Sequence, residues 1–314
     1  MRAYHLFGLV AVALLVVPVG TATAAMLYGS QGSFVYAIDP ATAAISTAMT
    51  NNDTSAGFGL GYVSPAGLEG GPTVNAAGSS FWGVVVTGGT TYLLEYDSTK
   101  TGAAMAAGSH VVSNVPTGLP GWGAAQGLAY SAVDNAFYVS FVKDDVNGAR
   151  YYLKIDATSY AATAVAIGTS LGGAWNDTDG LGVDPLTNKL YGSCSDKSYL
   201  ALIPQGLIAG PVPGGPANDI TAGISVYDFS AFGAVATSTS FGDMAASAGT
   251  LWSVANKTEA PTTKGDLYKY DIATKTDVLI GNIGANYQIY GLAYVPEPSV
   301  LGLLGLALLV LRRK

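Results

Sequence analysis

The chain has 314 residues, of which 49% are hydrophobic and only 11% are charged, and its formal net charge is −7. Ordinary soluble domains carry about 25% charged residues, so this composition excludes a coiled coil and a charge-rich disordered chain. The acidic balance also argues against nucleic acid as a partner, because phosphate contacts need clustered lysine and arginine. The length suffices for one large or two small domains with a substantial core.

Residues 1–25 have the pattern of a secretory signal peptide. A basic start at Met1-Arg2 is followed by the apolar run Leu6–Val17 and by the small residues Thr21–Ala25. This order is typical of export signals. As a helix the run would reach roughly 18 Å, well short of the roughly 30 Å hydrocarbon core of a membrane. We therefore predict export, with cleavage after Ala24 or Ala25.

Residues 26–294 form a tandem repeat. A six-residue pattern rich in aromatic and β-branched residues ends in Asp each time, and it occurs at Phe34–Asp39, Tyr92–Asp97, Tyr151–Asp156, Gly223–Asp228 and Asp266–Asp271. The pattern predicts a strand that runs into a turn, where the Asp carboxylate accepts hydrogen bonds from backbone N–H groups just beyond it.

Each repeat contains three further predicted strands. A short aromatic strand precedes each Asp pattern, at Leu27–Gly29, Phe81–Gly83, Phe137–Val139, Leu190–Gly192 and Leu251–Ser253. A Gly-Leu-Ala-Tyr-like strand comes about ten residues earlier. It is clear at Gly127–Tyr130 and Gly180–Val183, weaker at Gly242–Ala245, and near either Gly59 or Gly67 in another copy. A fourth strand follows the Asp turn, as at Thr163–Ile167 and Thr276–Ile280.

Four short strands, repeated about every 58 residues between Asp39 and Asp271, predict an all-β fold of the β-propeller type. The body begins with a second strand at Leu27–Gly29 and ends with a first strand at Gly291–Tyr294, so the two ends complete one blade and the total is five. A β-sandwich or jelly roll is the alternative, because this strand spacing also suits those folds. The Pro/Gly-rich stretch Pro204–Pro216 lengthens one repeat and predicts a surface loop.

Few residues of the body suit catalysis. His5 belongs to the signal peptide, so His110 lacks a second histidine for a relay or metal pair, and we expect it in a solvent-facing loop. The single Cys194 permits no internal disulfide and is expected to be a small buried residue. Five-bladed propellers include glycosidases whose Asp/Glu pairs project into the central channel, but no such pair stands out in this sequence.

Two features are candidate ligand sites. Asp177 and Asp179 belong to the densest cluster of oxygen ligands, which suits Ca²⁺, although the other ligands of an EF-hand are missing and an ordinary polar turn is the favoured interpretation. We therefore predict no resident cofactor. Trp122 and Trp175 lie in Gly-rich segments and could stack on sugar rings, or pack at the rim of a blade.

Residues 295–314 combine three features in a fixed order. They are the motif Pro296-Glu297-Pro298, the 12-residue apolar run Val300–Leu311 and the basic terminus Arg312-Arg313-Lys314. This order closely resembles the PEP-CTERM sorting tail of exopolysaccharide-producing Gram-negative bacteria, also known as an ice-binding protein C-terminal domain, a name that implies no ice binding here. The resemblance implies a short hydrophobic transmembrane helix and an exosortase that cleaves near the Pro-Glu-Pro motif.

The physics of this tail agrees with transient anchoring in the inner membrane. The apolar run is short for a permanent span, and the three terminal cations would stay in the cytoplasm under the positive-inside rule. After removal of both ends, residues 26–295 keep 20 of the 21 acidic residues and 10 of the 14 basic ones. An acidic body of this kind suits solubility outside the cell.

These observations predict an exported protein of the cell surface or extracellular matrix. The expected partners are the secretion machinery, an exosortase, and exopolysaccharide or envelope proteins, and the expected role is noncatalytic binding or structure. The alternative is a polysaccharide-active glycosidase or lyase on the same fold, because propellers host both kinds of function.

Overall fold

The computed structural model describes residues 25–46, 53–60, 65, 67–71, 80–116, 122–143, 150–168, 178, 180–193, 199–212, 217–228, 239–259 and 262–295. Contacts within the chain divide it into two units, Ala25–Val295 and a second unit of Met1–Ala24 and Pro296–Lys314. The predicted signal peptide, apart from Ala25, and the predicted sorting tail with its expected short helix, apart from Val295, lie outside the described residues.

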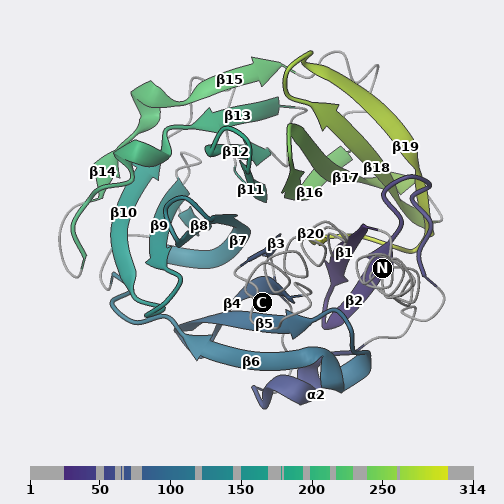
Figure 1. The fold of residues 1–314 in the computed structure, drawn as a ribbon, viewed down its shortest axis with the longest axis horizontal. Coiled ribbons are helices and arrows are strands. Elements are labelled where there is room, and N and C mark those ends of the chain that lie inside the picture. Colours follow the sequence, from purple (N-terminus) through teal and green to yellow (C-terminus); the bar gives the residue numbers. More distant parts are fainter. Residues whose placement is uncertain are drawn as a thin grey trace, which may run out of the picture. The chain divides into compact units, whose positions relative to one another are not determined.

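The unit Ala25–Val295 is a five-bladed β-propeller (Figure 1). From the innermost strand outward, blade 1 contains β20 (Gly291–Val295), β1 (Met26–Gln31) and β2 (Phe34–Ile38), and blade 2 contains β3 (Gly67–Gly70), β4 (Ser80–Thr87), β5 (Thr90–Asp97) and β6 (Ala106–Val111). In the same order, blade 3 contains β7 (Trp122–Ser131), β8 (Ala136–Lys143), β9 (Arg150–Asp156), β10 (Ala162–Gly168) and β14 (Asn218–Asp219). Blade 4 contains β11 (Gly180–Asp184), β12 (Lys189–Ser193), β13 (Tyr199–Ile203) and β15 (Ser225–Asp228), and blade 5 contains β16 (Thr239–Ser247), β17 (Thr250–Glu259), β18 (Thr262–Asp271) and β19 (Thr276–Ala285).

The ring closes between the two ends of the body, as the sequence predicts. Strand β20 pairs antiparallel with β1, with Leu27 opposite Tyr294 and Gly29 opposite Leu292. The innermost strands contact one another in the order β20, β3, β7, β11, β16 and back to β20. A sheet made from both chain ends therefore holds the first and last blades together.

Helices are few and short in the described part of the chain. They are α2 (Ser55–Phe58) and the 3₁₀ turns η2 (Gly102–Met105), η3 (Gln205–Leu207) and η4 (Thr221–Gly223). None of the helices in the described ranges has the length and apolar character needed to cross a membrane.

The predicted repeat maps onto the blades with one exception. The Asp-ending pattern forms the third strand of blades 1, 2, 3 and 5, but in blade 4 its Ser225–Asp228 is the outermost strand, and β13 is the third. The reason is an excursion of the chain after β13, which places β14 beside β10 of blade 3 before β15 returns to blade 4. The Pro204–Pro216 stretch belongs to this excursion, and Gly210 exchanges two backbone hydrogen bonds with Val165.

In blades 1, 2, 3 and 5 the repeated Asp residues hold the turns, as expected from the sequence. The carboxylate of Asp39 accepts a hydrogen bond from the Ala41 N–H at 2.7 Å, and Asp97 accepts one from the Thr99 N–H at 2.9 Å. Asp271 accepts bonds from both the N–H and the hydroxyl of Thr274. Such side chains replace backbone partners in a turn, which gives these Asp residues a structural role.

Apolar clusters fill the spaces between neighbouring blades. Between blades 2 and 3, for example, fully buried Trp82 packs in one cluster with Leu128 and Phe137. Similar clusters lie at the other four blade interfaces. Burial of one large apolar side chain contributes about 1.5–3 kcal/mol, so packing between blades is the main source of stability in this fold.

Glycines allow the inner strands to meet around the axis. A Cβ atom at Gly127 would lie 2.7 Å from the backbone nitrogen of Leu181, and one at Gly67 would lie 2.5 Å from that of Leu128. Real Cβ atoms do not approach backbone so closely. The copy of the Gly-Leu strand in blade 2 is therefore at Gly67, whereas Gly59 ends α2 in a left-handed conformation with φ of 67°.

We predict that Gly127→Ala destabilises the propeller, because the added methyl group meets backbone of the next blade rather than a movable side chain. Overpacking of this kind costs about 1–3 kcal/mol. Thermal unfolding should show a clearly lower Tm, whereas the control Gly206→Ala, where an added Cβ has no atom within 4 Å, should leave it nearly unchanged. Equal Tm values for the two variants would contradict this account of the axis.

Candidate functional site

Most of the sequence candidates lie outside the described residues. This holds for Trp175, Asp177, Asp179 and Cys194, and for residues 296–314 of the predicted sorting tail, including Pro296, Glu297, Pro298, Arg312, Arg313 and Lys314. Trp122 is the first residue of β7 and its backbone lies opposite Lys143, but its side chain is outside the described part. In the ranges that the structure describes, no three His, Cys, Asp or Glu side chains gather as a set of metal ligands.

The expectation for His110 is wrong. It lies in β6, and its side chain is only 28% exposed. Its ring stacks on Tyr160 of blade 3 at 4.1 Å between centroids, and Nε2 lies 3.5 Å from the carboxylate of Glu95. The rings of Trp82 and Tyr160 both lie beside His110. These neighbours come from other strands, so the sequence around His110 does not reveal them.

Asp243 is a buried carboxylate on the axis of the ring. It stands in β16 at the position that Gly67, Gly127, Gly180 and Gly291 hold in the other inner strands, one residue later than the Gly242 alignment predicts. Its carboxylate accepts backbone hydrogen bonds from Leu68 at 2.7 Å, Leu181 at 3.0 Å and Leu292 at 3.4 Å. One side chain therefore joins blade 5 to blades 1, 2 and 4.

Glu69 supplies a second buried carboxyl group beside Asp243. Its Oε1 accepts a bond from the Gly70 N–H at 3.0 Å, and among the described residues its Oε2 has no hydrogen-bond partner. Burial, and then the charge of Asp243, raise the pKa of Glu69 well above its ordinary value of 4.5. Burial also raises the pKa of Asp243, although the backbone N–H groups that it accepts oppose this. Glu69 has fewer hydrogen-bond donors than Asp243 to oppose the effect of burial on its pKa.

These two carboxyl groups are the pair that sequence reasoning did not find. Glu69 is 5% exposed and Asp243 is 1% exposed, and the Asp243 carboxylate accepts hydrogen bonds from backbone N–H groups of several blades. A glycosidase pair must flank a substrate bond, with space for the sugar between its carboxyl groups. The position of Asp243 and Glu69 instead suits a structural role, in which they satisfy backbone donors that converge on the axis.

A groove of about 490 Å³ lies between blades 5 and 1. It is lined by Gln31, Gly32, Phe34, Tyr36, Ala285, Asn286 and Tyr287. Four of these residues belong to the hairpin of β1 and β2, and three lie where β19 ends and the chain crosses to β20. The groove is thus built from the two segments that meet where the ring closes.

The crossover between β19 and β20 is held firmly by both blades. The side chain of Asn256 in β17 donates to the Ile289 carbonyl at 2.8 Å and accepts from the Ile289 N–H at 3.0 Å. The Tyr290 N–H donates to the Ser30 carbonyl at 2.9 Å, and the Gln31 side chain donates to the Asn286 carbonyl at 3.2 Å. These bonds fix the backbone that presents Tyr287 to the groove.

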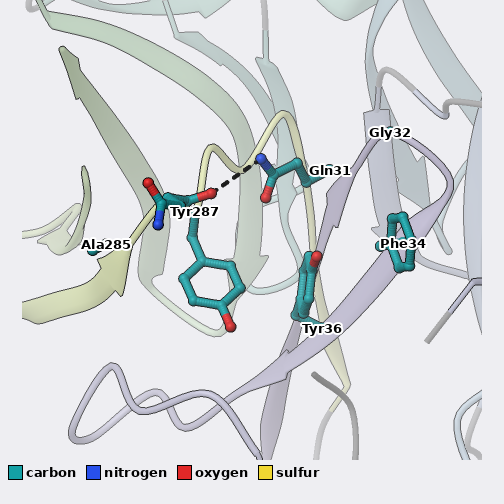
Figure 2. A pocket seen from close by; sticks show the side chains of 7 residues that line it. Gln31, Gly32, Phe34, Tyr36, Ala285 and Tyr287 are labelled. Atoms are coloured by element: carbon teal, nitrogen blue, oxygen red, sulfur yellow. Dashed lines mark hydrogen bonds between the residues drawn. The ribbon is translucent and has the colours of Figure 1, made fainter. Parts of the chain in front are cut away.

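Aromatic rings form the apolar surface of the groove (Figure 2). The buried Tyr36 ring meets the half-buried Tyr287 ring edge-on, with centroids 5.1 Å apart and an interplanar angle of 81°. The half-buried Phe34 ring lies 6.5 Å from Tyr36, nearly parallel to it. Burial raises the pKa of Tyr36, so its hydroxyl stays protonated. The site therefore combines rings, neutral hydroxyl groups and the amides of Gln31 and Asn286.

A second hollow, of about 480 Å³, lies between blades 3 and 4 and differs in character. It contains Asp134, whose carboxylate accepts bonds from the Tyr138 hydroxyl at 2.6 Å and the Gln205 amide at 3.0 Å. Burial acts to raise the pKa of Asp134, but these bonds and the nearby Lys154 charge lower it overall. Asp134, the Tyr138 hydroxyl and the Gln205 amide nitrogen thus satisfy one another, whereas the Oε1 of Gln205 has no partner among the described residues. We take the groove between blades 5 and 1 as the candidate site because its aromatic rings come from two blades.

The sequence contains the groove residues without marking them as a site. Phe34 and Tyr36 alternate along a strand, as residues on one face of a sheet do, but the repeat explains them equally well as core. Tyr287 lies about 250 residues away, and only the closure of the ring brings it to the same place. The predicted pairing of Leu27–Gly29 with Gly291–Tyr294 is the one sequence feature that indicates where blades 5 and 1 meet.

No protein-family model matches the sequence, and no curated protein is similar to it. Among solved structures, the chain is similar to the PQQ-bound aldose sugar dehydrogenase from Streptomyces coelicolor, with 12% identity and a TM-score of 0.38 over 81% of this chain and 77% of that chain. It is similar to a protein from Lactobacillus plantarum, with 10% identity and a TM-score of 0.41 over 86% and 99% of the two chains. It is also similar to the Dos1 propeller, with 13% identity and a TM-score of 0.33 over 83% of this chain and 57% of that chain. These likenesses give neither a ligand nor an activity.

The raised pKa of Glu69 leads to a test of the axis. The folded state favours the protonated form of Glu69. The contribution of this group to the free energy of unfolding is therefore fully present below about pH 4.5, and it is lost as the pH rises through the pKa of the folded state. Glu69→Gln stays neutral at every pH, so its Tm relative to the native chain should rise between about pH 5 and about pH 8.

The control for this test is Asp53→Asn. The N–H and hydroxyl of Ser55 lower the pKa of Asp53 below its ordinary value of 3.8, so Asp53 remains ionised throughout that pH range. Its effect on Tm should therefore not vary between these pH values. A Glu69→Gln effect that is equally independent of pH would contradict a raised pKa of Glu69 in the folded state.

Proposed function

We propose that this protein is an exported, noncatalytic component of the cell surface or extracellular matrix that binds polysaccharide through the groove between blades 5 and 1. The observation that carries this proposal is the lining of the groove, where aromatic rings and amide groups converge from two blades. Binding sites for small ligands are mostly apolar hollows of about 300–1,000 Å³ with a few placed polar groups. This groove has that size and composition.

The backbone of the groove is organised before any ligand arrives. Asn256 of blade 5 and Gln31 of blade 1 both bind the crossover. Asn286 adopts a left-handed conformation with φ of 71°, which asparagine tolerates better than most residues. A preformed site loses little conformational entropy on binding. Repeated weak contacts along a polymer can then add up to firm retention.

The cellular context of the proposal comes from the two ends of the chain. The signal-type residues 1–25 support export, and the resemblance of residues 295–314 to PEP-CTERM tails supports transient anchoring in the inner membrane and exosortase cleavage near Pro296-Glu297-Pro298. Such tails belong to bacteria that produce exopolysaccharide, which makes exopolysaccharide the natural ligand class. Trp122 and Trp175 remain further candidates for contact with the same polymer.

The enzymatic alternative would need an accessible pair of carboxyl groups. The axial pair Asp243 and Glu69 is buried, and the described residues that line the groove include no carboxylate. This supports binding over hydrolysis or lyase chemistry. Sugar release from purified polysaccharide that is abolished by an Asp→Asn change would instead favour the enzyme.

The groove proposal is tested by Tyr287→Ala. Loss of one stacked ring should weaken retention on the producer's own polysaccharide by about threefold to tenfold, as expected for an aromatic contact of about 0.5–1.5 kcal/mol. Affinity electrophoresis in gels that contain the polysaccharide measures this directly. Tyr287→Phe keeps the ring and should retain most of the binding.

The matched control is Tyr290→Ala. Tyr290 lies in the same crossover, is 48% exposed, and does not line the groove. Its removal should change neither retention nor Tm appreciably. Equal weakening by Tyr290→Ala and Tyr287→Ala would show that the crossover as a whole, rather than the groove, decides retention.

The sorting proposal is tested by mass spectrometry of the protein released by its own host. We expect a product that begins near Ala25 or Met26 and lacks Arg312–Lys314. Replacement of Pro296-Glu297-Pro298 by three alanines should leave the protein in the membrane fraction. Release with an intact C-terminus from a host that contains an exosortase would contradict the proposal.

A further inference from the structure

We infer that the groove between blades 5 and 1 selects uncharged polysaccharide segments and does not recognise the carboxylate, phosphate or sulfate groups of acidic polymers. This inference rests on the proposed function and names the class of ligand that the groove accepts. Its basis is the charge of the residues in and around the groove.

The residues that the structure describes in the lining of the groove carry no charge. Its polar side chains are the amides of Gln31 and Asn286 and the hydroxyl groups of Tyr36 and Tyr287. These groups donate and accept hydrogen bonds with sugar hydroxyls, and none supplies a positive charge. By contrast, the hollow between blades 3 and 4 contains Asp134 and Lys154.

The body contains a single copy of the residue type that best recognises anionic groups. Arginine binds carboxylate and phosphate through two parallel hydrogen bonds, and lysine does so less specifically. Between residues 26 and 295 the only arginine is Arg150, which is 6% exposed and belongs to β9 in blade 3. It lies in a different blade from both segments that build the groove.

An acidic residue next to the groove would repel an anionic polymer. Asp53 pairs in an isolated bridge with Phe34, which lines the groove, and its carboxylate is held ionised by the N–H and hydroxyl of Ser55 at 2.9 Å and 2.8 Å. The body as a whole has 20 acidic and 10 basic residues. Both the local and the overall charge therefore disfavour approach of an acidic chain.

Lys264 provides a control because its backbone pairs with a residue that lines the groove. Lys264 of β18 lies opposite Ala285, which lines the groove, so its backbone is at the border of the site. Lys264→Gln removes one positive charge from the strand that borders the groove, so this variant should weaken the binding of an acidic polymer. If the ligand is neutral, Lys264→Gln should leave binding unchanged.

The rings suit the apolar faces of neutral sugars. Phe34 and Tyr287 are half-buried and pack against the core cluster that contains Tyr36, so Tyr36 forms the floor and the other two rings form the sides. Stacking on such rings depends on contact area and not on charge, and it is therefore insensitive to salt.

The experiment compares one polysaccharide in two charge states. The producer's own polysaccharide is used as purified and after chemical reduction of its uronic acid carboxyl groups to neutral hydroxymethyl groups. The full-length native chain, Tyr287→Ala and Lys264→Gln are run by affinity electrophoresis against both polymers, at about 50 mM and about 500 mM salt.

We expect retention of the native chain by the reduced polymer to be at least as strong as by the untreated one, and equal at both salt concentrations. Lys264→Gln should behave like the native chain, and Tyr287→Ala should lose about threefold to tenfold in affinity for both polymers. If the untreated polymer proves to contain no acidic sugar, retention by it that is unchanged by salt gives the same support.

Two results would count against this account, and they are distinguishable. Retention that disappears on carboxyl reduction, weakens at high salt and is lost in Lys264→Gln would overturn the selection of neutral ligands while leaving the proposed polysaccharide binding intact. Absence of retention by either polymer at either salt concentration would refute the proposed function itself.

Discussion

The hydrogen bonds of the Asp243 carboxylate organise the centre of this propeller. Five inner strands meet closely enough that glycine is required at most of their contact points, and backbone N–H groups then point toward the axis without partners in their own sheets. A buried, unpaired N–H group costs about 1–3 kcal/mol. By accepting bonds from Leu68, Leu181 and Leu292, one side chain satisfies donors from three other blades. The fifth strand therefore carries Asp where the others carry Gly.

The closure of the ring decides where a ligand site can form. Pairing of β20 with β1 requires the chain to cross from the outer edge of blade 5 to the inner edge of blade 1, and the bonds of Asn256 and Ser30 hold that crossover in place. The rings of Tyr36 and Tyr287 meet only because of this crossing. The groove is thus a consequence of the same connection that keeps the propeller closed.

The sequence was sufficient for the fold and insufficient for the site, for physical reasons. Strand periodicity and Asp turns are local, so the blades, the turns at Asp39 and Asp97, and the closing strand were predictable. Gly223–Asp228 was assigned to the wrong strand of its blade because the excursion to β10 is a long-range pairing that composition does not reveal. The carboxylate at Asp243 and the aromatic groove depend on contacts between different blades, which no single segment encodes.

A ligand in the groove would also act on the stability of the ring. The groove residues come from blade 1 and blade 5, which lie next to one another only when the propeller is closed, so the unfolded chain offers no such site. Binding to the folded state alone adds to the free energy of unfolding in proportion to the logarithm of ligand concentration over Kd. The body has a single cysteine and thus no internal disulfide, and its closure depends on β20 pairing with β1. A polymer that bridges the two blades at this seam would therefore reinforce the ring at the place where its two ends meet.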